Sequence, residues 1–299
     1  MSAAVSPSPD ETLTPGTADY ALAHRAGYLL RRSHRLHGRL WSALAPMGMT
    51  SPQYGVLSVI HRHPGIDQTT LGGHTSLDRA TVANIVARLV DRGTVRREPD
   101  TLDARRRRLT LDPASAAEVE HGRAAAKAVW SDMFGPVPSS DREEFVAQLR
   151  QLAGFDSEEL DAGALFRRLE QRRSAAWSEI IGEILTGAQY AVVHVVRQYP
   201  GVSQTELGKL AAVDRSTVAE LLDRLEDRGW VIRTVDAADA RFRRVFLSEE
   251  AVNTLRDLDP SLARVQRRLL EPVEPRSRAV LLENWALLAY RGAVPSAAR

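Results

Sequence analysis

Cysteine is absent from the 299-residue sequence, so disulfide bonds, thiolate metal sites and thiol-based redox sensing are excluded. Aromatic residues are sparse at 6%, and no apolar run of about 18 residues occurs, so no membrane-spanning helix is predicted. The formal net charge is only +2, which does not by itself indicate a nucleic-acid partner. Arginine, by contrast, is abundant and clustered, and its local distribution is more informative than the total charge.

Motifs for catalysis are also missing. The sequence has no Gly-rich phosphate loop, no nucleophile elbow and no catalytic pair of carboxylates, so we do not expect an enzyme. His61 and His63 have no partner at metal-ligand spacing, so we expect no metal and no other cofactor. Residues 1–18 are rich in Ser, Pro and Thr and lack the features of a secretory signal. We expect a disordered lead-in there, and a cytoplasmic protein.

The sequence repeats itself. Residues 27–111 align without a gap onto residues 163–247 at a constant offset of 136, and 36 of the 85 paired positions are identical. Identity at this level over a fixed period indicates a duplicated domain. The predicted organisation is a lead-in, a first domain, a short linker and a second domain, at residues 1–18, 19–154, 155–162 and 163–293.

Hydrophobic spacing predicts a mainly helical domain with one short hairpin in each repeat. In the first repeat, helices are expected at about 20–45, 50–63, just after Asp67, 78–92, 114–134 and 139–152, with strands at 95–99 and 106–111. In the second repeat, the strands are expected at 231–235 and 242–247 and the closing helices at 249–270 and 275–290. Ser203 and Glu206 have the spacing of a capping box, and Gly93 and Gly229 are expected to end the helices before the hairpins.

Apolar residues at helical spacing predict which faces are buried. On the first helix these residues are Leu29, Leu36, Leu40 and Leu44. On the helix before each hairpin they are Val82, Ile85, Val86 and Leu89, and Val218, Leu221, Leu222 and Leu225.

Helix, turn, helix and hairpin in this order is a winged helix-turn-helix. The major groove of B-DNA admits one α-helix, and a hairpin can reach the neighbouring groove. Opposite the buried face of helix 78–92 lie Ala80, Asn84 and Ala87, with Thr81 and Arg88 beside them. Small residues around one long polar residue allow close approach to base edges. Four consecutive positions of the hairpin, residues 105–108, are arginines, which suit the negative potential of a narrow minor groove.

At this point the chain resembles the MarR family of multiple antibiotic resistance regulators. The residues that carry the resemblance are Gln68-Thr-x-Leu71-Gly, Asp78-Arg-x-Thr-Val82, Arg88-Leu-x-Asp-Arg-Gly93, Asp103-x-Arg105 and Leu109-x-Leu111. The second repeat shows the same order as Gln204-Thr-x-Leu207-Gly, Asp214-Arg-x-Thr-Val218, Arg224-Leu-x-Asp-Arg-Gly229, Asp239-x-Arg241 and Val245-x-Leu247. The resemblance extends over about residues 20–290.

The resemblance implies a fold and a function. Members of the family are typically homodimers whose first and last helices interlock, and a small aromatic acid or phenol often binds beneath that layer and weakens DNA binding. Fusion of two copies makes an intramolecular pseudo-dimer possible, in which the two copies can diverge. We therefore expect two winged helix-turn-helix domains, mainly α with small β wings, joined through a helical dimerisation layer.

The residues expected to contact DNA lie on the two helix-turn-helix motifs and the wings. In the first repeat they are Gln68, Thr69, Asp78, Arg79, Ala80, Thr81, Asn84, Arg88, Arg105, Arg106 and Arg107. In the second repeat they are Gln204, Thr205, Arg215, Ser216, Thr217, Glu220, Arg224, Arg241 and Arg243. The alternative for the wing arginines is a solvated, salt-bridged hairpin, and Asp103 with Arg105 is more simply a structural pair.

A small-molecule site is expected where rings and polar groups share a helix face. Its candidate residues are His34, His37, Trp41, Tyr54 and Ser58 in the first repeat and Arg173, Trp177, Tyr190 and His194 in the second. A ring can stack on an aromatic anion while a cation or histidine binds its carboxylate. The simpler interpretation of Trp41 and Trp177 is packing within the helical layer.

The predicted function is a sequence-specific transcription regulator, a repressor, that is released by a small aromatic or anionic ligand. Its partners would be double-stranded DNA with an imperfect palindromic operator and the effector, with no membrane, and further self-association stays open. The alternative is a winged-helix protein-interaction module that has lost DNA binding or ligand sensing. The arginines kept in both wings disfavour that alternative, although Glu220 and Asp223 indicate a weaker grip by the second repeat.

Overall fold

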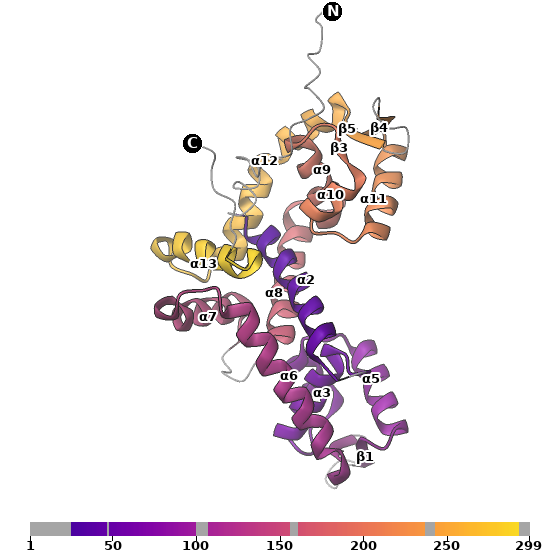
Figure 1. Cartoon of the computed structure of the whole chain (residues 1–299), viewed down its shortest axis with the longest axis vertical. Coiled ribbons are helices and arrows are strands. Elements are labelled where there is room, and N and C mark those ends of the chain that lie inside the picture. Colours follow the sequence, from indigo (N-terminus) through magenta and orange to yellow (C-terminus); the bar gives the residue numbers. More distant parts are fainter. Residues whose placement is uncertain (1–24, 47, 100–106, 156–160, 237–242, 293–299) are drawn as a thin grey trace, which may run out of the picture. The chain divides into compact units, whose positions relative to one another are not determined.

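The computed structural model describes residues 25–46, 48–99, 107–155, 161–236 and 243–292 (Figure 1). The chain forms two compact units, neither of which is continuous in sequence. Among the described residues, the first unit lies within 30–172 and 271–292, and the second within 25–29 and 173–270. None of the described helices is long and apolar enough to cross a bilayer.

The first unit contains the first helix-turn-helix and its wing. Its elements are α2 (Ala26–Leu44, from residue 30), α3 (Ser51–Arg62), α4 (Gln68–Thr75), α5 (Arg79–Asp91), β1 (Val95–Pro99), β2 (Arg107–Leu111), η1 (Pro113–Ser115), α6 (Ala116–Phe134), α7 (Ser139–Ala153), the start of α8 (Ala162–Ile180), η2 (Pro275–Ser277) and α13 (Arg278–Tyr290).

The second unit contains the second helix-turn-helix and its wing. Its elements are the first turn of α2, the rest of α8, α9 (Gly187–Gln198), β3 (Val202–Ser203), α10 (Gln204–Leu210), α11 (Arg215–Asp227), β4 (Val231–Val235), β5 (Arg243–Leu247) and α12 (Glu249–Leu270).

Glycines end both helices that precede the wings, as predicted. Gly93 and Gly229 adopt φ values of +73° and +76°, a conformation that costs glycine little because it has no Cβ. The Thr94 N–H bonds to the Leu89 carbonyl at 2.9 Å and the Gly93 N–H to that of Val90 at 2.9 Å, which satisfies carbonyls at the helix end. At these glycines the chain turns out of α5 and α11 and continues into the first strand of each wing, β1 or β4.

The capping prediction for α10 is only half right. The Ser203 hydroxyl accepts the Glu206 N–H at 3.3 Å, but the Glu206 carboxylate accepts the Ser203 hydroxyl proton at 3.0 Å. Ser203 also ends β3, whose backbone pairs with β5. Complete capping boxes occur instead at the starts of α3 and α9, where Thr50 pairs with Gln53 and Thr186 with Gln189.

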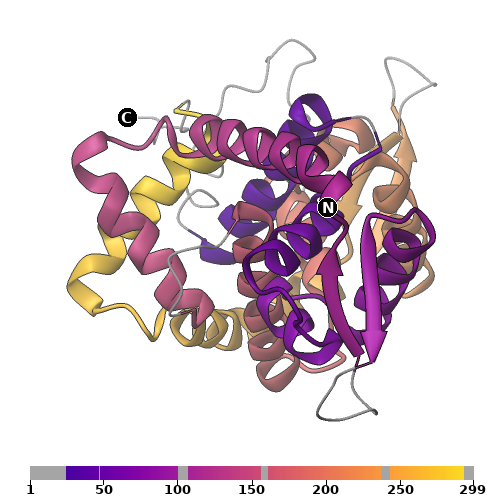
Figure 2. The same cartoon turned by 90° about the horizontal axis from the view of Figure 1, so that it is seen from below.

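The wings are antiparallel hairpins at the predicted positions. In β1–β2 (Figure 2) Val95 lies opposite Leu111, and in β4–β5 Val231 lies opposite Leu247. Sequence patterns did not predict that the second sheet has a third strand, in the order β3-β5-β4. Gly201, at φ +82° in the Pro–Gly turn, brings its N–H to within 2.9 Å of the Val245 carbonyl, and the same turn in the first repeat leads only to an isolated bridge between Ile66 and Leu109.

The predicted buried faces are largely correct. The apolar residues predicted to be buried on α5 and α11 are all buried. Leu29, Leu36 and Leu40 are also buried, but the prediction for Leu44 is wrong, because this last residue of α2 is 42% exposed. Gly122 allows α6 to approach α3 closely, since a methyl group there would lie 2.5 Å from the Tyr54 ring.

The repeats exchange terminal helices. In the first unit, α13 of the second repeat packs against α6 and α7 of the first (Figure 1), and the buried Trp285 Nε1 donates to the Ser33 hydroxyl at 3.1 Å. In the second unit, the Tyr28 hydroxyl of the first repeat donates to the Leu210 carbonyl at 2.6 Å. This interlocking is the pseudo-dimer that the resemblance predicted. The boundaries drawn at residues 154 and 163 stay a prediction about the repeats.

Replacing Trp285 with alanine should therefore destabilise the fold that contains the first repeat. Trp285 is fully buried, and truncation of such a side chain costs about 3–5 kcal/mol. The matched control is Val280→Ala on the same helix, where the side chain is 50% exposed and a change within about 0.5 kcal/mol is expected. Urea denaturation of both variants measures this, and similar effects of the two would contradict the packing described.

Candidate nucleic-acid interface and effector site

The N-terminus of α5 is fixed by its cap. The Asp78 carboxylate accepts the Thr81 N–H at 2.8 Å and the Thr81 hydroxyl at 2.6 Å. These hydrogen bonds lower the pKa of Asp78. Both side chains therefore hold the helix, and their contact with DNA stays a prediction. Beyond the cap, α5 presents Ala80, Asn84 and Arg88 to solvent on the face opposite its buried residues.

The residues before α5 are arranged by a second cap. Asp67 accepts the N–H groups of Thr69 and Thr70 at 2.9 and 3.0 Å and so starts α4. Thr69 is exposed and Gln68 is half-buried. In the second repeat the aligned Thr205 and Gln204 have the same exposure.

The second recognition helix, α11, exposes a more acidic face. Arg215, Ser216, Thr217, Glu220 and Arg224 are exposed. In the same unit, Arg233 of β4 binds two carboxylates of α11, with Nη1 2.8 Å from Asp223 Oδ1 and Nε 2.9 Å from Glu226 Oε2. The bond to Arg233 is the main cause of the lowered pKa of Glu226.

The first repeat has no such neutralisation at the aligned positions. Ala87 and Val90 align with Asp223 and Glu226, and Arg97, which aligns with Arg233, is exposed. Arg79 also lies exposed at the start of α5. The first recognition surface is therefore the more positive of the two.

In each wing, one arginine of the second strand packs on the Pro–Gly turn and the arginine before it is exposed to solvent. Arg108 lies against the Pro–Gly turn, because a methyl group on Gly65 would be 2.5 Å from its Nη2. Arg244 likewise donates to the Gly201 carbonyl at 3.2 Å and forms an ion pair with Asp236. Arg107 and Arg243, at the strand starts, are exposed. Arg105, Arg106, Arg241 and Asp103 lie outside the described residues.

The first unit contains an open pocket of about 690 Å³ beneath α2. Its walls are the C-terminal half of α2, the segment that leads into α3, and one residue of α8, Arg167. Three predicted residues, His34, His37 and Trp41, line it. Trp41 is held in place by its Nε1, which donates to the Met49 carbonyl at 2.8 Å.

Tyr54 and Ser58 are not among the residues that line this pocket. Tyr54 packs against Trp41, with 5.3 Å between the centres of the two rings. Burial is the main cause of the raised pKa of the Tyr54 hydroxyl, partly offset by its hydrogen bond with Ser58. Their role in ligand binding stays a prediction.

Two polar atoms at this pocket are buried without a hydrogen-bond partner: Arg167 Nη2 and Ser51 Oγ. The Arg167 Nε donates to the Thr75 carbonyl, at the C-terminus of α4, at 3.1 Å. Burial lowers the pKa of Arg167, and it lowers the pKa of His37 to about 4. At neutral pH the imidazole of His37 is thus neutral, and the guanidinium of Arg167 lies in the field of the Asp161 carboxylate, which raises its pKa against the effect of burial.

Arg167 and Ser51 were not among the residues that the sequence predicts for this site. Arg167 belongs to the second repeat and reaches the first helix-turn-helix only through the exchange of helices, so spacing within one repeat could not identify it. The one signal was that this position is Arg in both repeats, as Arg31 and Arg167.

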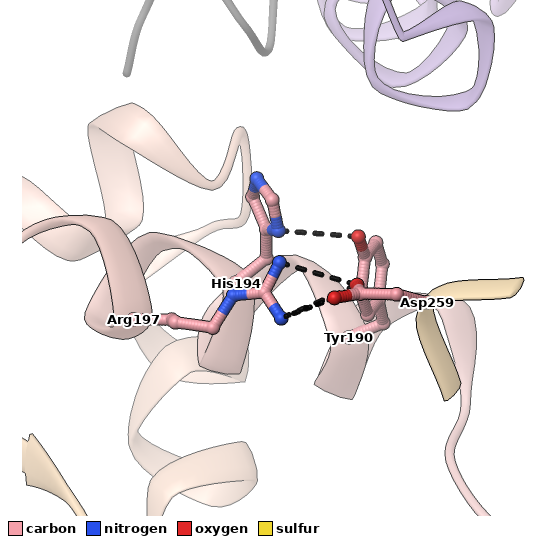
Figure 3. A network of polar contacts seen from close by, with 4 residues as sticks. All are labelled: Tyr190, His194, Arg197 and Asp259. Atoms are coloured by element: carbon pink, nitrogen blue, oxygen red, sulfur yellow. Dashed lines mark hydrogen bonds and ion pairs between the residues drawn. The ribbon is translucent and has the colours of Figure 1, made fainter. Parts of the chain in front are cut away.

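The predicted residues of the second unit form a packed polar cluster. Trp177 Nε1 donates to the Leu185 carbonyl at 2.6 Å, and its ring lies 5.4 Å from that of Tyr190. The Tyr190 hydroxyl is 3.1 Å from His194 Nδ1, and Arg197 lies beside this pair and bonds to Asp259 at 3.2 Å (Figure 3). Arg173 is 8% exposed, with its guanidinium 5.9 Å from the Trp177 ring.

Burial of His194 predicts acid sensitivity. Burial first, then the charges of Arg25 and Arg197, lower its pKa to about 3, whereas an unfolded histidine titrates near about 6.5. Below about pH 6.5 the unfolded chain binds a proton that the folded chain does not, so the unfolding free energy should fall as the pH falls. His194→Ser, which introduces the residue at the aligned position of the first repeat, should flatten this decline in urea denaturation between about pH 7 and 5. The exposed His121→Ser is the control, and an unchanged slope for His194→Ser would refute the assignment.

Comparison with known proteins gives matches for each repeat. A model of the MarR family matches residues 47–106 and 185–241. The transcriptional regulator HosA of Escherichia coli is 35% identical over 136 residues, which are 44% of this chain and 97% of the relative. An HTH-type transcriptional repressor of Mycobacterium tuberculosis is 26% identical over 127 residues, 42% of this chain and 91% of the relative.

Solved structures resemble the chain over one repeat's length. The PcaV transcriptional regulator of Streptomyces coelicolor, solved in complex with its natural ligand, is 33% identical with a TM-score of 0.40 and covers 41% of this chain and 86% of its own. The transcriptional repressor CouR, solved bound to a 23-mer DNA duplex, is 28% identical with a TM-score of 0.40 and covers 43% of this chain and 92% of its own.

HosA is aligned over nearly its whole length and the family model matches at two places, which are the two helix-turn-helix regions. The chain therefore belongs to the MarR family of transcription regulators, with two family domains in tandem.

Proposed function

We propose that this protein is a sequence-specific DNA-binding repressor of transcription whose grip on DNA is weakened by a small aromatic anion. The observation that carries the proposal is the pair of winged helix-turn-helix motifs, each with a recognition helix whose polar face is exposed. Such a helix fits the major groove, and the relatives named above include transcriptional repressors.

DNA is the partner that best fits the exposed charges. Arg79, Arg88 and Arg107 of the first repeat, and Arg215, Arg224 and Arg243 of the second, are all exposed. Arginines at these places can bind phosphates and enter the minor groove beside the wing. A protein-interaction module that has lost DNA would have no reason to keep them in both repeats.

The pocket of the first unit fits an aromatic carboxylate. Arg167 Nη2 and Ser51 Oγ are buried donors without partners, and a buried unsatisfied group costs about 1–3 kcal/mol. A carboxylate would satisfy both, with a charge-assisted bond to Arg167. Trp41 lines the same pocket and offers a surface for a ring.

The same arginine provides a route from ligand to DNA. Arg167 Nε holds the Thr75 carbonyl, and Ser76, the next residue, turns the chain with φ +53° towards α5. A ligand that draws the guanidinium into the pocket would loosen or shift this bond. The start of the recognition helix would move with it, which links occupancy of the pocket to DNA affinity.

Removing the exposed wing arginines should lower the salt dependence of DNA binding. Arg107→Ala and Arg243→Ala should each make the slope of log affinity against log salt concentration shallower by about one unit. The reason is that binding releases about one counterion fewer from the DNA for each phosphate contact that is lost. The control is Arg276→Ala, an exposed arginine of η2 paired with Glu274. Fluorescence anisotropy over a salt series measures the slopes, and an unchanged slope in folded wing variants would exclude contact at the strand starts.

The operator should be an imperfect palindrome. Asn84 in the first repeat aligns with Glu220 in the second, and both are exposed. Asn pairs with adenine, whereas Glu accepts from cytosine, and each good contact discriminates by about 1–3 kcal/mol.

Selection of sites from a random DNA pool tests this directly. The double exchange Asn84→Glu with Glu220→Asn should reverse the preferred orientation of the asymmetric site, and Arg276→Ala should not. A symmetric consensus for the native chain would mean that these two positions do not contact bases.

A further inference from the structure

Several positions that line the pocket of the first unit differ between the repeats, and two of them bear on whether the equivalent space in the second unit is open. His37 and Ser51 line the pocket of the first unit. At the constant offset of 136 these positions hold Arg173 and Gly187 in the second repeat. The second repeat thus has the long, charged side chain of Arg173 in place of the neutral imidazole of His37, and no side chain in place of the Ser51 hydroxyl.

Arg173 fills the space over the start of α9. A methyl group on Gly187 would lie 2.5 Å from Arg173 Nη1 and 3.2 Å from its Cζ. The guanidinium therefore occupies the place that the Ser51 side chain has in the first unit. Any side chain at position 187 would displace it, so Arg173 and Gly187 act as a matched pair.

His194 adds further bulk to the same cluster. It aligns with Ser58, is 3% exposed, and bonds to the Tyr190 hydroxyl. Its Nε2 has no hydrogen-bond partner, and burial, with the charges of Arg25 and Arg197, lowers its pKa and keeps the imidazole neutral. A neutral imidazole binds an anion less strongly than a charged group does.

We propose that the chain binds a single aromatic anion, in the first unit at Arg167 and Ser51, and that Arg173 permanently occupies the equivalent space in the second unit. The proposal rests on the proposed effector function and goes beyond it, because two family domains would otherwise bind two ligands. The first unit binds the ligand, and in the second unit the Arg173 side chain lies where a ligand would bind.

Binding stoichiometry tests the proposal. The full chain is titrated by calorimetry at neutral pH with benzoate and its three monohydroxy isomers, and with benzyl alcohol as a neutral probe. We expect one acid per chain for the acids that bind, and at least tenfold weaker binding of benzyl alcohol. Arg167→Gln should weaken acid binding at least tenfold.

Exchanging the matched pairs between the repeats tests the role of Arg173. His37→Arg with Ser51→Gly gives the first repeat the residues of the second, and acid binding should be lost. Arg173→His with Gly187→Ser gives the second repeat the residues of the first, and the stoichiometry should rise from one to two. Circular dichroism establishes that each variant is folded, and the native stoichiometry tests the proposal even where one is not.

The outcomes separate the two proposals. Two acids per native chain would leave the effector function intact and overturn the single-site assignment. One acid per chain, unaffected by Arg167→Gln, would overturn the location of the site. A stoichiometry that stays at one in the folded Arg173→His, Gly187→Ser variant would show that Arg173 is not what closes the second site. No binding of any acid would overturn the aromatic-anion function and the single-site proposal together.

Discussion

The bond from Arg167 to the Thr75 carbonyl is the interaction on which the arrangement of the first unit depends. The C-terminus of a helix leaves carbonyls unpaired and favours a cation, and here the cation comes from the other repeat. Gln171 strengthens the contact, since its amide donates to the Ser76 carbonyl at 3.0 Å. The turn between α4 and α5 of the first repeat is therefore held by α8, a helix of the second repeat.

Fusion of two copies removes the constraint that symmetry places on a homodimer. In a symmetric dimer every substitution appears twice, so a change that closes one ligand site closes both. In this chain His37 and Arg173 can differ, and so can Asn84 and Glu220. The fold tolerates this divergence because terminal glycines and buried apolar faces are kept at the recognition helices of both repeats.

Local signals in the sequence predicted most of the fold. The recognition helices and wings were placed correctly because caps such as Asp78, terminal glycines such as Gly93 and buried stripes are properties of neighbouring residues. Leu44 and the third strand β3 were not, because burial at a helix end and strand pairing depend on distant segments. The pocket was predicted in part. His37 and Trp41 follow from spacing on one helix, whereas Arg167 reaches the pocket only through packing between repeats.

On the proposed assignments, the ligand acts on the stronger half of the DNA-binding surface. An effector shifts an equilibrium only by its difference in affinity between two states, so it must bind better when the bond from Arg167 to Thr75 is altered. That bond orders the turn before α5, the recognition helix without acidic neighbours at the positions of Asp223 and Glu226. The second repeat, with Arg233 committed to those carboxylates, contributes less attraction to phosphate. Loosening the recognition helix of the first repeat alone therefore removes the larger share of the protein's attraction to DNA phosphates. A second ligand site would add little to the control of DNA binding.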